Sequence, residues 1–508
     1  MSATDDTIEA LKKAQEKPSD DLAKATYETQ GFSQQSGLNH YDLEAPAKKL
    51  YPVITPLRNM IPRVAGNGDT ATRWRAITAI NTTNMRMGVA EGARSGQISQ
   101  KTVDYSAAYK GIGLESFCTF ESEYSSQGFD DVRARAVEGL LRSFFIGEEF
   151  LILGGNSSVA LGKPVTPTLT AQTTPAGNLA SGTAINVHCV PLTLDGLRGS
   201  SIAGGVPRRE SRDPADGGSA VTINAGSGEV SDAATVTPSA GNSSIFATTT
   251  PIDGAAAYAW YWGVTGSELL GAVTTVAHVL ITDTATGTEN VSVYNAEDYS
   301  QDNTVFDGIL TQIATSGSNS YIDHLDNGTA ASIGTKLTSD GAGGIEQIDK
   351  AFRHFWDEYR LSPDLMIVSA QELNNITAIL MANGGQGGTF FRYGLDGAAD
   401  SVESRTITAG QVVGQYLNKF TMSGGQMVKV MLHPNMPAGT ILFYSTSIPY
   451  PLSNVDNLMQ IKARKNYYQI EFPLRTRRYE FGVYADELLQ CYFPPAYGVI
   501  TNIADGTA

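Results

Sequence analysis

The residue types that most often do chemistry in proteins are present, but not in a pattern that a reaction needs. The six histidines are scattered, and none forms the H-x-x-x-H or H-E-x-x-H pair that would hold a zinc ion. No Gly-x-Ser-x-Gly motif provides a serine nucleophile. Gly162-Lys163 does not match a phosphate-binding loop, because Pro164 follows it and Ser157 stands where the motif needs glycine. We therefore expect no catalytic residue, no metal and no cofactor, and a protein that is not an enzyme.

Two further patterns could bind or catalyse. Glu148 and Glu149 are adjacent, and neighbours on a helix point about 100° apart, so they cannot act together as a paired acid and base. We expect a salt link from this pair to an arginine instead. The glycines between Gly384 and Gly388 could cradle a phosphate, but they follow a predicted helix and open none. A flexible loop is expected there and over residues 391–405.

A basic cluster near the C-terminal end is the remaining candidate. It has Tyr467, Tyr468 and Phe472 between its members, which are Lys462, Arg464, Lys465, Arg475, Arg477 and Arg478. Basic residues interleaved with aromatic rings are typical of nucleic-acid binding. Glu471 and Glu480 flank the cluster, however, and the strand pattern favours salt bridges between subunits. We prefer the salt bridges, and the nucleic-acid interpretation would fit contact with DNA that does not depend on its sequence.

Length and composition indicate a protein with several domains. A chain of 508 residues with 41% hydrophobic residues can bury more than one core, and its 52 glycines indicate many turns. No apolar run is long enough to span a membrane, and the polar start is unlike a signal peptide. Three widely spaced cysteines indicate a reducing compartment. These features disfavour a secreted carbohydrate-active enzyme.

The negative charge is concentrated in the middle of the chain. The whole chain has a net charge of −16, and residues 164–335 contain no lysine, four arginines and sixteen acidic residues, a net charge of −12. Nucleic-acid phosphates would repel such a block. We expect it to lie away from nucleic acid.

Residues 1–67 are predicted to be an N-terminal helical segment followed by an extended arm. The pattern of residues 5–28 is helical, whereas four prolines between positions 46 and 62 argue against a helix in the arm. Leu50, Val53 and Ile54 are too apolar for a free linker. The arm therefore needs a surface to lie on.

Residues 68–120 are predicted to form one long hairpin. Its outgoing strand contains Trp74 and Ile77, and its tip contains Glu91 and Arg94. An isolated two-stranded ribbon is marginally stable in water. We therefore expect the hairpin to lie on a neighbouring subunit.

Residues 121–164 centre on a helix predicted from Phe129 to Leu153. Its apolar residues recur at helical spacing, Arg133 points elsewhere, and Gly154-Gly155 ends it.

Residues 165–304 change to short strand-like runs, including Val165–Thr170, Ala184–Leu194, Ala220–Ala225, Ile245–Thr249, Ala257–Trp262, Val273–Ile281 and Val291–Tyr294. Runs of this kind predict an inserted β-sandwich. The aromatic strand near Trp260 is similar to one in immunoglobulin-like or fibronectin-type domains.

Residues 305–440 and 441–508 return to a mixed pattern. An amphipathic helix is predicted over Gly344–Arg360, then a strand over Leu365–Ser369 and a helix over Ala370–Met381. Alternating residues predict a strand over 428–432, and another starts at Ile441. The segment 441–508 supplies closing strands.

The order of these elements resembles the major capsid proteins of tailed bacteriophages, which share the Hong Kong 97 type fold. The motifs that carry the resemblance are AEGA and YKGIGLESFCTFESE after the hairpin tip, EEFLILGG at the end of the long helix, SPDLMIVS and HPNMPAG. They cover about residues 30–160 and 305–503. The resemblance implies an α+β fold with an N-arm, an extended loop, a peripheral domain with a long spine helix and an axial domain. The all-β sandwich would be inserted into it.

The resemblance also implies a function. It is that of a major capsid protein, which self-assembles in the host bacterial cytoplasm into the icosahedral head shell of the virion and encloses a double-stranded DNA genome. The implied partners are further copies of the chain in hexamers and pentamers, portal and scaffolding proteins, packaged DNA bound non-specifically and a decoration protein, with no membrane. The alternative is another virion component, a tail or decoration protein, with an immunoglobulin-like domain.

Thirteen residues are the candidates for assembly interfaces. They come from the arm, the hairpin, the long helix and the basic cluster, and they are Leu50, Val53, Ile54, Trp74, Ile77, Glu91, Arg94, Arg133, Glu148, Glu149, Arg475, Arg477 and Arg478.

Overall fold

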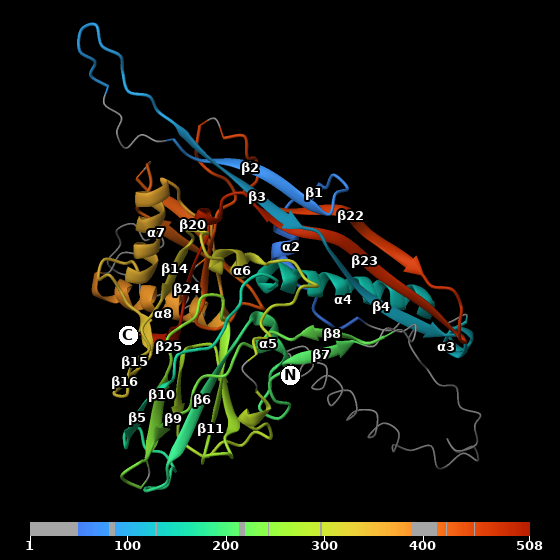
Figure 1. Cartoon of the computed structure of the whole chain (residues 1–508), viewed down its shortest axis with the longest axis vertical. Coiled ribbons are helices and arrows are strands. Elements are labelled where there is room, and N and C mark those ends of the chain that lie inside the picture. The colour runs from blue at the N-terminus through green and yellow to red at the C-terminus, as the bar shows by residue number, and fades with distance from the viewer. Residues whose placement is uncertain are drawn as a thin grey trace, which may run out of the picture. The chain divides into compact units, whose positions relative to one another are not determined.

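The computed structural model describes most of the chain as a mixed α+β protein (Figure 1). The residues described are 49–80, 87–127, 130–212, 219–241, 243–294, 297–387, 414–422, 424–451 and 453–507. The helix predicted within residues 5–28 and the loop predicted over 391–405 lie outside them. The chain divides into two compact units, and the first comprises Met1–Thr55, Gly113–Gly147 and Tyr468–Tyr484.

The second unit contains a six-stranded mixed sheet. Its strand order is β14-β24-β21-β18-β20-β19, with β18 parallel to β20 and antiparallel to β21. The strands are β14 (Tyr321–His324), β24 (Gly498–Thr501), β21 (Ile441–Tyr444), β18 (Leu365–Val368), β20 (Gln426–Leu432) and β19 (Gln415–Asn418). The predicted strands at 365–369, 428–432 and 441 are therefore confirmed.

Helices α7 (Glu346–Tyr359) and α8 (Ala370–Gly387) pack on this sheet. Phe352 and Phe355 of α7 are fully buried against Phe443 of β21, as the amphipathic spacing predicts. Arg360 adopts a left-handed conformation with φ of 53° and ends α7. Helix α8 continues beyond its predicted end at Met381 to Gly387, so the loop predicted from Gly384 is wrong over these residues. A helical glycine costs only about 1 kcal/mol, which packing of the preceding turns can offset.

Two further sheets of the second unit share one core. Their orders are β13-β10-β5 and β12-β11-β6-β9, and buried side chains from both, including Val187, Ile245, Trp260 and Ile281, form a single cluster. The strands are β5 (Thr168–Gln172), β6 (Ile185–Leu192), β9 (Ala234–Val236), β10 (Ser244–Thr248), β11 (Ala257–Gly263), β12 (Leu269–Thr274) and β13 (His278–Ile281). These two sheets therefore pack face to face, as Figure 1 shows in green.

One predicted strand in this region is wrong, one is present but pairs outside the two sheets, and one is divided in two. The run Val291–Tyr294 is a 3₁₀ turn, η2 (Val291–Val293), because Asn290 accepts a hydrogen bond from the Ser292 amide. The run Ala220–Ala225 is β8 (Val221–Asn224), which pairs with β7 (Arg209–Arg212) in a separate hairpin. The run Val273–Ile281 is divided between β12 and β13. The Thr274 hydroxyl donates to the Val276 carbonyl in the connection between them. Strand β9 and helix α5 (Leu194–Gly199) were not predicted.

The chain also forms a four-stranded sheet and a long helix. The sheet has the order β1-β22-β23-β4, from β1 (Arg63–Ala65), β22 (Met459–Glu471), β23 (Arg478–Cys491) and β4 (Lys110–Thr119). Helix α4 (Val132–Gly154) has 23 residues and buries Leu140 and Phe144, in agreement with the predicted spacing. Its predicted start at Phe129 lies outside the described residues. Short helix α3 (Phe120–Ser126) follows β4.

The hairpin and the arm differ from their predicted forms. Strands β2 (Ala71–Ile80) and β3 (Gln100–Ala108) pair as predicted, but the chain after Tyr109 leaves the ribbon and enters the four-stranded sheet as β4. The arm contains a helix, α2 (Pro56–Met60), where the prolines had argued against one. Proline is tolerated at the first helical position because its missing N–H would have no partner there, and Pro62 lies beyond the helix end.

The remaining elements are short. Strand β25 (Ile503–Thr507) pairs with β17 (Thr335–Leu337), and β15 (Gly328–Thr329) pairs with β16 (Ser332–Ile333). Helices α6 (Ile309–Ala314) and η3 (Pro494–Ala496) complete the described set. No described helix has the length and apolarity that a membrane crossing requires.

The core beneath α7 gives a direct test of this packing. Replacing the fully buried Phe352 with alanine should destabilise the chain by about 3–5 kcal/mol, because the cavity cannot close completely. Replacing Phe117, which is 56% exposed, should have little effect and serves as the control. Denaturant midpoints of the two variants measure the difference, and equal midpoints would contradict the assigned core.

Candidate assembly surface

The described residues contain no arrangement suited to catalysis by a metal. No group of three or more histidine, cysteine or acidic side chains among them could hold an ion. A cavity of about 670 Å³ beside the double sheet is lined by charged residues that include Glu289 and Glu297. Both carboxylates accept a tyrosine hydroxyl, from Tyr261 at 2.5 Å and from Tyr299 at 2.7 Å respectively. Their hydrogen bonds are therefore made within the chain.

The outer part of the β2–β3 ribbon is exposed on both faces. Ile77 is 63% exposed and Ile80 is 53% exposed, and every residue from 87 to 102 is exposed. Three large apolar side chains, Met87, Val89 and Ile98, lie in this stretch. Figure 1 shows the segment projecting from the rest of the second unit (top left). A projection with this much apolar surface lacks the cover that a folded chain normally provides.

The base of the ribbon is fixed to the chain itself. Trp74 stacks on its cross-strand partner Tyr105, with ring centroids 5.7 Å apart, and meets the edge of Tyr492 at 6.0 Å. Lys462 of β22 also donates to the Thr72 hydroxyl at 2.8 Å. Trp74 therefore attaches the ribbon to the rest of the second unit, whereas Ile77 belongs to the exposed part. Glu91 and Arg94 are both exposed at the tip, where Gly92 adopts a φ of 77° in a turn.

The arm also presents apolar side chains. Leu50 and Ile54 are 54% and 60% exposed, while Val53 is half-buried. Leu57 at the start of α2 and Ile61 just after its end are both buried. The arm therefore changes from an exposed apolar segment to an anchored one within a few residues.

Glu149 anchors the start of α2. Its carboxylate accepts the amides of Leu57 at 2.8 Å and Arg58 at 2.7 Å, which are two of the N–H groups that a helix start leaves without partners. The Nε2 atom of His433, which follows β20, donates to the same carboxylate at 2.7 Å. Glu149 thus acts as the N-terminal cap of a helix about ninety residues earlier in the chain.

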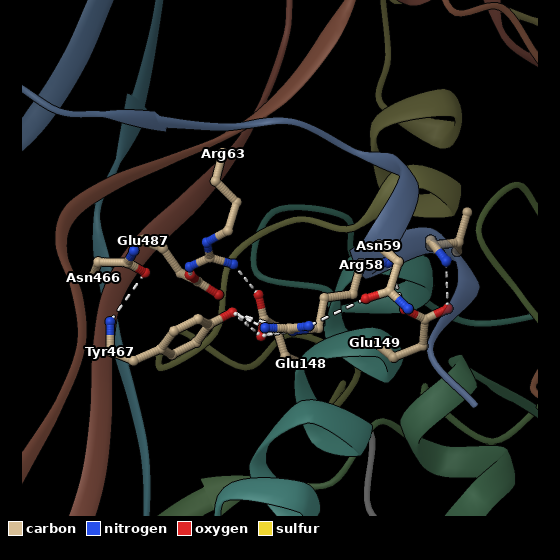
Figure 2. A network of polar contacts seen from close by, with 9 residues as sticks. Arg58, Asn59, Arg63, Glu148, Glu149, Asn466, Tyr467 and Glu487 are labelled. Atoms are coloured by element: carbon tan, nitrogen blue, oxygen red, sulfur yellow. Dashed lines mark hydrogen bonds and ion pairs between the residues drawn. The ribbon is translucent and has the colours of Figure 1, made fainter. Parts of the chain in front are cut away.

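Glu148 gathers a second set of groups on the other side of α4 (Figure 2). Arg58 Nε donates to it at 2.9 Å, the Tyr467 hydroxyl donates to it at 2.6 Å, and Arg63 pairs with its other oxygen. The Arg63 guanidinium also lies over the Tyr467 ring, 4.4 Å from its centroid. Segments from α2, β1, α4 and β22 therefore meet at one carboxylate.

Glu487 of β23 completes this cluster. It pairs with the second nitrogen of Arg63 and is fully buried. Burial, followed by the nearby charge of Glu148, raises the pKa of Glu487 to about 7. Burial alone would lower the pKa of Arg63, but Glu487 and Glu148 raise it above its ordinary value. Burial and Glu148 likewise raise the pKa of Tyr467, so its hydroxyl stays protonated.

The expected salt link from the Glu148–Glu149 pair to an arginine is present, and it lies within one chain. Both glutamates are buried, at 1% and 0% exposure, so neither side chain is available to a neighbouring subunit. Their placement among the interface residues is therefore corrected. They hold the segment between the arm and the ribbon from inside.

The basic cluster also has partners within the chain. Arg477 pairs with Glu121 at 2.9 Å, Arg478 with Glu480, and Arg464 with Asp486 at 3.0 Å. Arg133 of α4 pairs with Glu471 at 2.9 Å and lies over the Tyr479 ring. Arg475 is exposed in the connection between β22 and β23. These ion pairs lie inside one chain, and the salt bridges expected between subunits stay a prediction.

Sequence reasoning missed most of the buried cluster. Arg58, Arg63, His433, Tyr467 and Glu487 were not singled out as its members, because they are spread over more than four hundred residues of sequence. One available signal was the adjacent Glu148 and Glu149 near the end of a helix with apolar neighbours, since buried charges require partners. That signal predicts arginines nearby but not which ones.

Comparisons with known proteins returned structures only. No family model and no curated sequence matches the chain. Among solved structures, the capsid of Myoviridae phage XM1 matches with a TM-score of 0.40 and 10% identity, covering 93% of this chain and 99% of that one. The cyanophage A-1(L) capsid matches with a TM-score of 0.39 and 12% identity, covering 92% and 98%. The SrpI encapsulin of Synechococcus elongatus matches with a TM-score of 0.33 and 10% identity, covering 90% and 92%.

Removing the cap of α2 tests the anchor. Replacing Glu149 with alanine leaves two amides and His433 without their buried acceptor, so we expect a loss of about 3–5 kcal/mol and faster tryptic cleavage after Arg58. The control is Glu138→Ala, which removes exposed ion pairs to Lys49 and Arg142 and should change stability little. Equal proteolysis of the two variants would show that Glu149 does not hold α2.

Proposed function

We propose that the chain is the major capsid protein of a tailed phage, and that many copies of it form the icosahedral shell around a double-stranded DNA genome. The observation that supports this most is the ribbon, whose base is fixed to the body while its outer part has no cover. Such a segment is suited to lie on another subunit. The motifs that resemble capsid proteins fall on the tip of this ribbon, on β4 and α3, on the end of α4, on β18 and on the connection between β20 and β21.

Five apolar side chains would supply the energy of this contact. Ile77, Ile80, Met87, Val89 and Ile98 are all exposed on one projection. Full burial of one such side chain contributes about 1.5–3 kcal/mol before the entropic cost of association is subtracted. A neighbouring copy that covers several of them would gain enough to fix the ribbon in one position. Closed symmetry would repeat this contact around the whole shell.

The parts of the chain then take the following roles. Residues 1–67 are the N-terminal segment and arm, 68–120 the extended loop, and 121–164 the peripheral domain with α4 as spine helix. Residues 165–304 are the inserted immunoglobulin-like sandwich, 305–440 the axial domain and 441–508 the closing strands. Copies associate as hexamers and pentamers, with scaffolding and portal proteins and a decoration protein as further partners and with packaged DNA inside.

The ribbon gives the test of this function. Replacing Ile77 and Ile80 together with serine should leave the melting temperature of the soluble chain nearly unchanged, because both side chains are exposed. Assembly should fail, because the contact that covers them is lost. Sedimentation through a sucrose gradient separates shells from capsomers and single chains.

The matched control replaces Val165 and Ile202 with serine. Val165 is 63% exposed, the same as Ile77, but lies outside the ribbon. This control should sediment as shells, as the wild type does. Normal shells from the Ile77/Ile80 variant would contradict the assignment of the ribbon, and wild-type tubes or small particles would favour a tail or decoration protein.

The acidic block supplies a second test. A net charge of −12 over residues 164–335 would face DNA phosphates if the sandwich pointed inward, which is unfavourable within a Debye length of about 8–10 Å. We therefore expect it on the outer surface. Because Cys118, Cys189 and Cys491 are all buried, a single new cysteine at the exposed Val264 can report its side.

A maleimide coupled to a large polymer should label the Val264→Cys variant on intact, filled shells as completely as on opened shells. Unmodified chain provides the background, since its cysteines are inaccessible. Labelling that begins only after the shells are opened would place the sandwich inside and overturn the charge argument.

A further inference from the structure

The buried cluster around Arg63 contains more acidic than basic groups. Glu148, Glu149 and Glu487 face Arg58 and Arg63, and the other titratable groups against them are His433 and Tyr467. All of these residues belong to the second unit. If all three carboxylates were ionised while His433 and Tyr467 were neutral, the cluster would carry one uncompensated negative charge. A buried charge of that kind is costly, so the position of one proton matters.

His433 does not supply that proton. Its Nε2 donates to Glu149 at 2.7 Å, while its Nδ1 accepts the Asn435 amide at 3.1 Å. This pattern satisfies both nitrogens of the neutral imidazole. A second proton on Nδ1 would point at the Asn435 N–H, so two donors would face each other. His433 is 1% exposed, which leaves no room for solvent to relieve that conflict.

Two buried polar atoms of the cluster have no hydrogen-bond partner, Nε of Arg63 and one carboxylate oxygen of Glu487. Both oxygens of Glu148 already accept hydrogen bonds, one from Arg63 and the other from Arg58 and Tyr467. Both oxygens of Glu149 accept backbone amides. Glu487 uses Oε2 for Arg63, but its Oε1 is buried with no hydrogen-bond partner. Oε1 of Glu487 is therefore the carboxylate atom of this cluster that lacks a donor.

We propose that Glu487 carries a buried proton in the folded chain, and that this proton keeps the segment Pro56–Ala65 clamped to α4 and β23. Losing it would leave two carboxylates repelling each other across Arg63 and a bare anionic oxygen out of contact with water. The segment would then loosen where Arg58 and Arg63 enter the cluster. This clamp concerns groups of a single chain, so it stands independently of the proposed capsid function.

The direction of the pH dependence follows from burial and from the charge of Glu148. They raise the pKa of Glu487 in the folded chain from its ordinary value of 4.5 to about 7. The proton-bound clamp is therefore fully present below the ordinary value and is lost as the pH rises through about 7. Arg63 stays charged and Tyr467 stays neutral over this range, because both have pKa values raised above their ordinary ones.

Loosening of the segment Pro56–Ala65 would also affect the β2–β3 ribbon. The clamped segment contains α2 and β1 and leads directly into β2, whose Trp74 contacts Tyr492 just beyond β23. Proton release at Glu487 would loosen the root of the ribbon without changing its exposed tip.

Hydrogen–deuterium exchange of the full chain tests the clamp. After correction for intrinsic exchange rates, amides of residues 56–65 should exchange about tenfold faster at pH 8 than at pH 6, as expected for a single group that titrates near 7. Glu487→Gln keeps the shape and removes the charge, so exchange of this segment should stay slow at both pH values. Glu358→Gln, at an exposed position of α7, should behave as the wild type does.

A spectroscopic measurement keeps the proposal testable if Glu487→Gln fails to fold. Burial also raises the pKa of Glu372 to about 7, so infrared spectra are recorded on the Glu372→Gln variant. They should contain a protonated-carboxyl band that titrates near pH 7 and that a further Glu358→Gln change leaves in place. Absence of that band at pH 6, or exchange in residues 56–65 that does not change between pH 6 and pH 8, would overturn the proposal. Fast exchange of a folded Glu487→Gln variant at both pH values would also overturn it.

Discussion

Two adjacent carboxylates near the C-terminal end of α4 decide where the chain before the ribbon lies. Because Glu148 and Glu149 follow each other on a helix, they point in different directions and bind different partners. Glu149 caps α2, and Glu148 binds Arg58, Arg63 and Tyr467. If either group were missing, the segment that leads into β2 would lose its fixed attachment, and the ribbon would lose a defined direction.

In this arrangement, one part of the chain positions the ribbon and another part is available to bind a neighbouring copy. A buried ionic cluster contributes little net stability compared with well-packed apolar residues, but its many directional bonds define one geometry. The exposed tip has the opposite character, because its large apolar side chains Met87, Val89 and Ile98 are exposed. A ribbon that is fixed at its base by Trp74 and the cluster, and bare at its tip, presents its apolar surface at a constant place. That is the property a repeated subunit contact requires.

Elements governed by local pattern could be predicted from the sequence. The 3,4-spaced apolar residues of α7, the short buried run of β18 and the aromatic strand β11 are where periodicity placed them. Prediction from local pattern failed where a residue distant in the sequence stabilises an element. The prolines of the arm argue against a helix, but Pro56 occupies the first helical position, where proline fits, and Glu149 caps the helix.

The candidate assembly surface was also predictable only where local pattern determines it. Exposed apolar residues such as Ile54 and Ile77 could be selected from the sequence, because nothing nearby in the pattern accounts for them. The partners of charged residues could not, since Arg63 meets Glu487 across 424 positions of sequence. Arg477 likewise pairs with Glu121, which lies far away in the sequence.

The most direct test of the central claim is electron microscopy of the purified, overexpressed chain, carried to a reconstruction that resolves the ribbon. The account predicts closed icosahedral shells in which residues 77–102 of one copy lie against the next copy and bury Ile77, Ile80 and Met87. Particles that are single chains, or shells in which this segment stays in solvent, would contradict it.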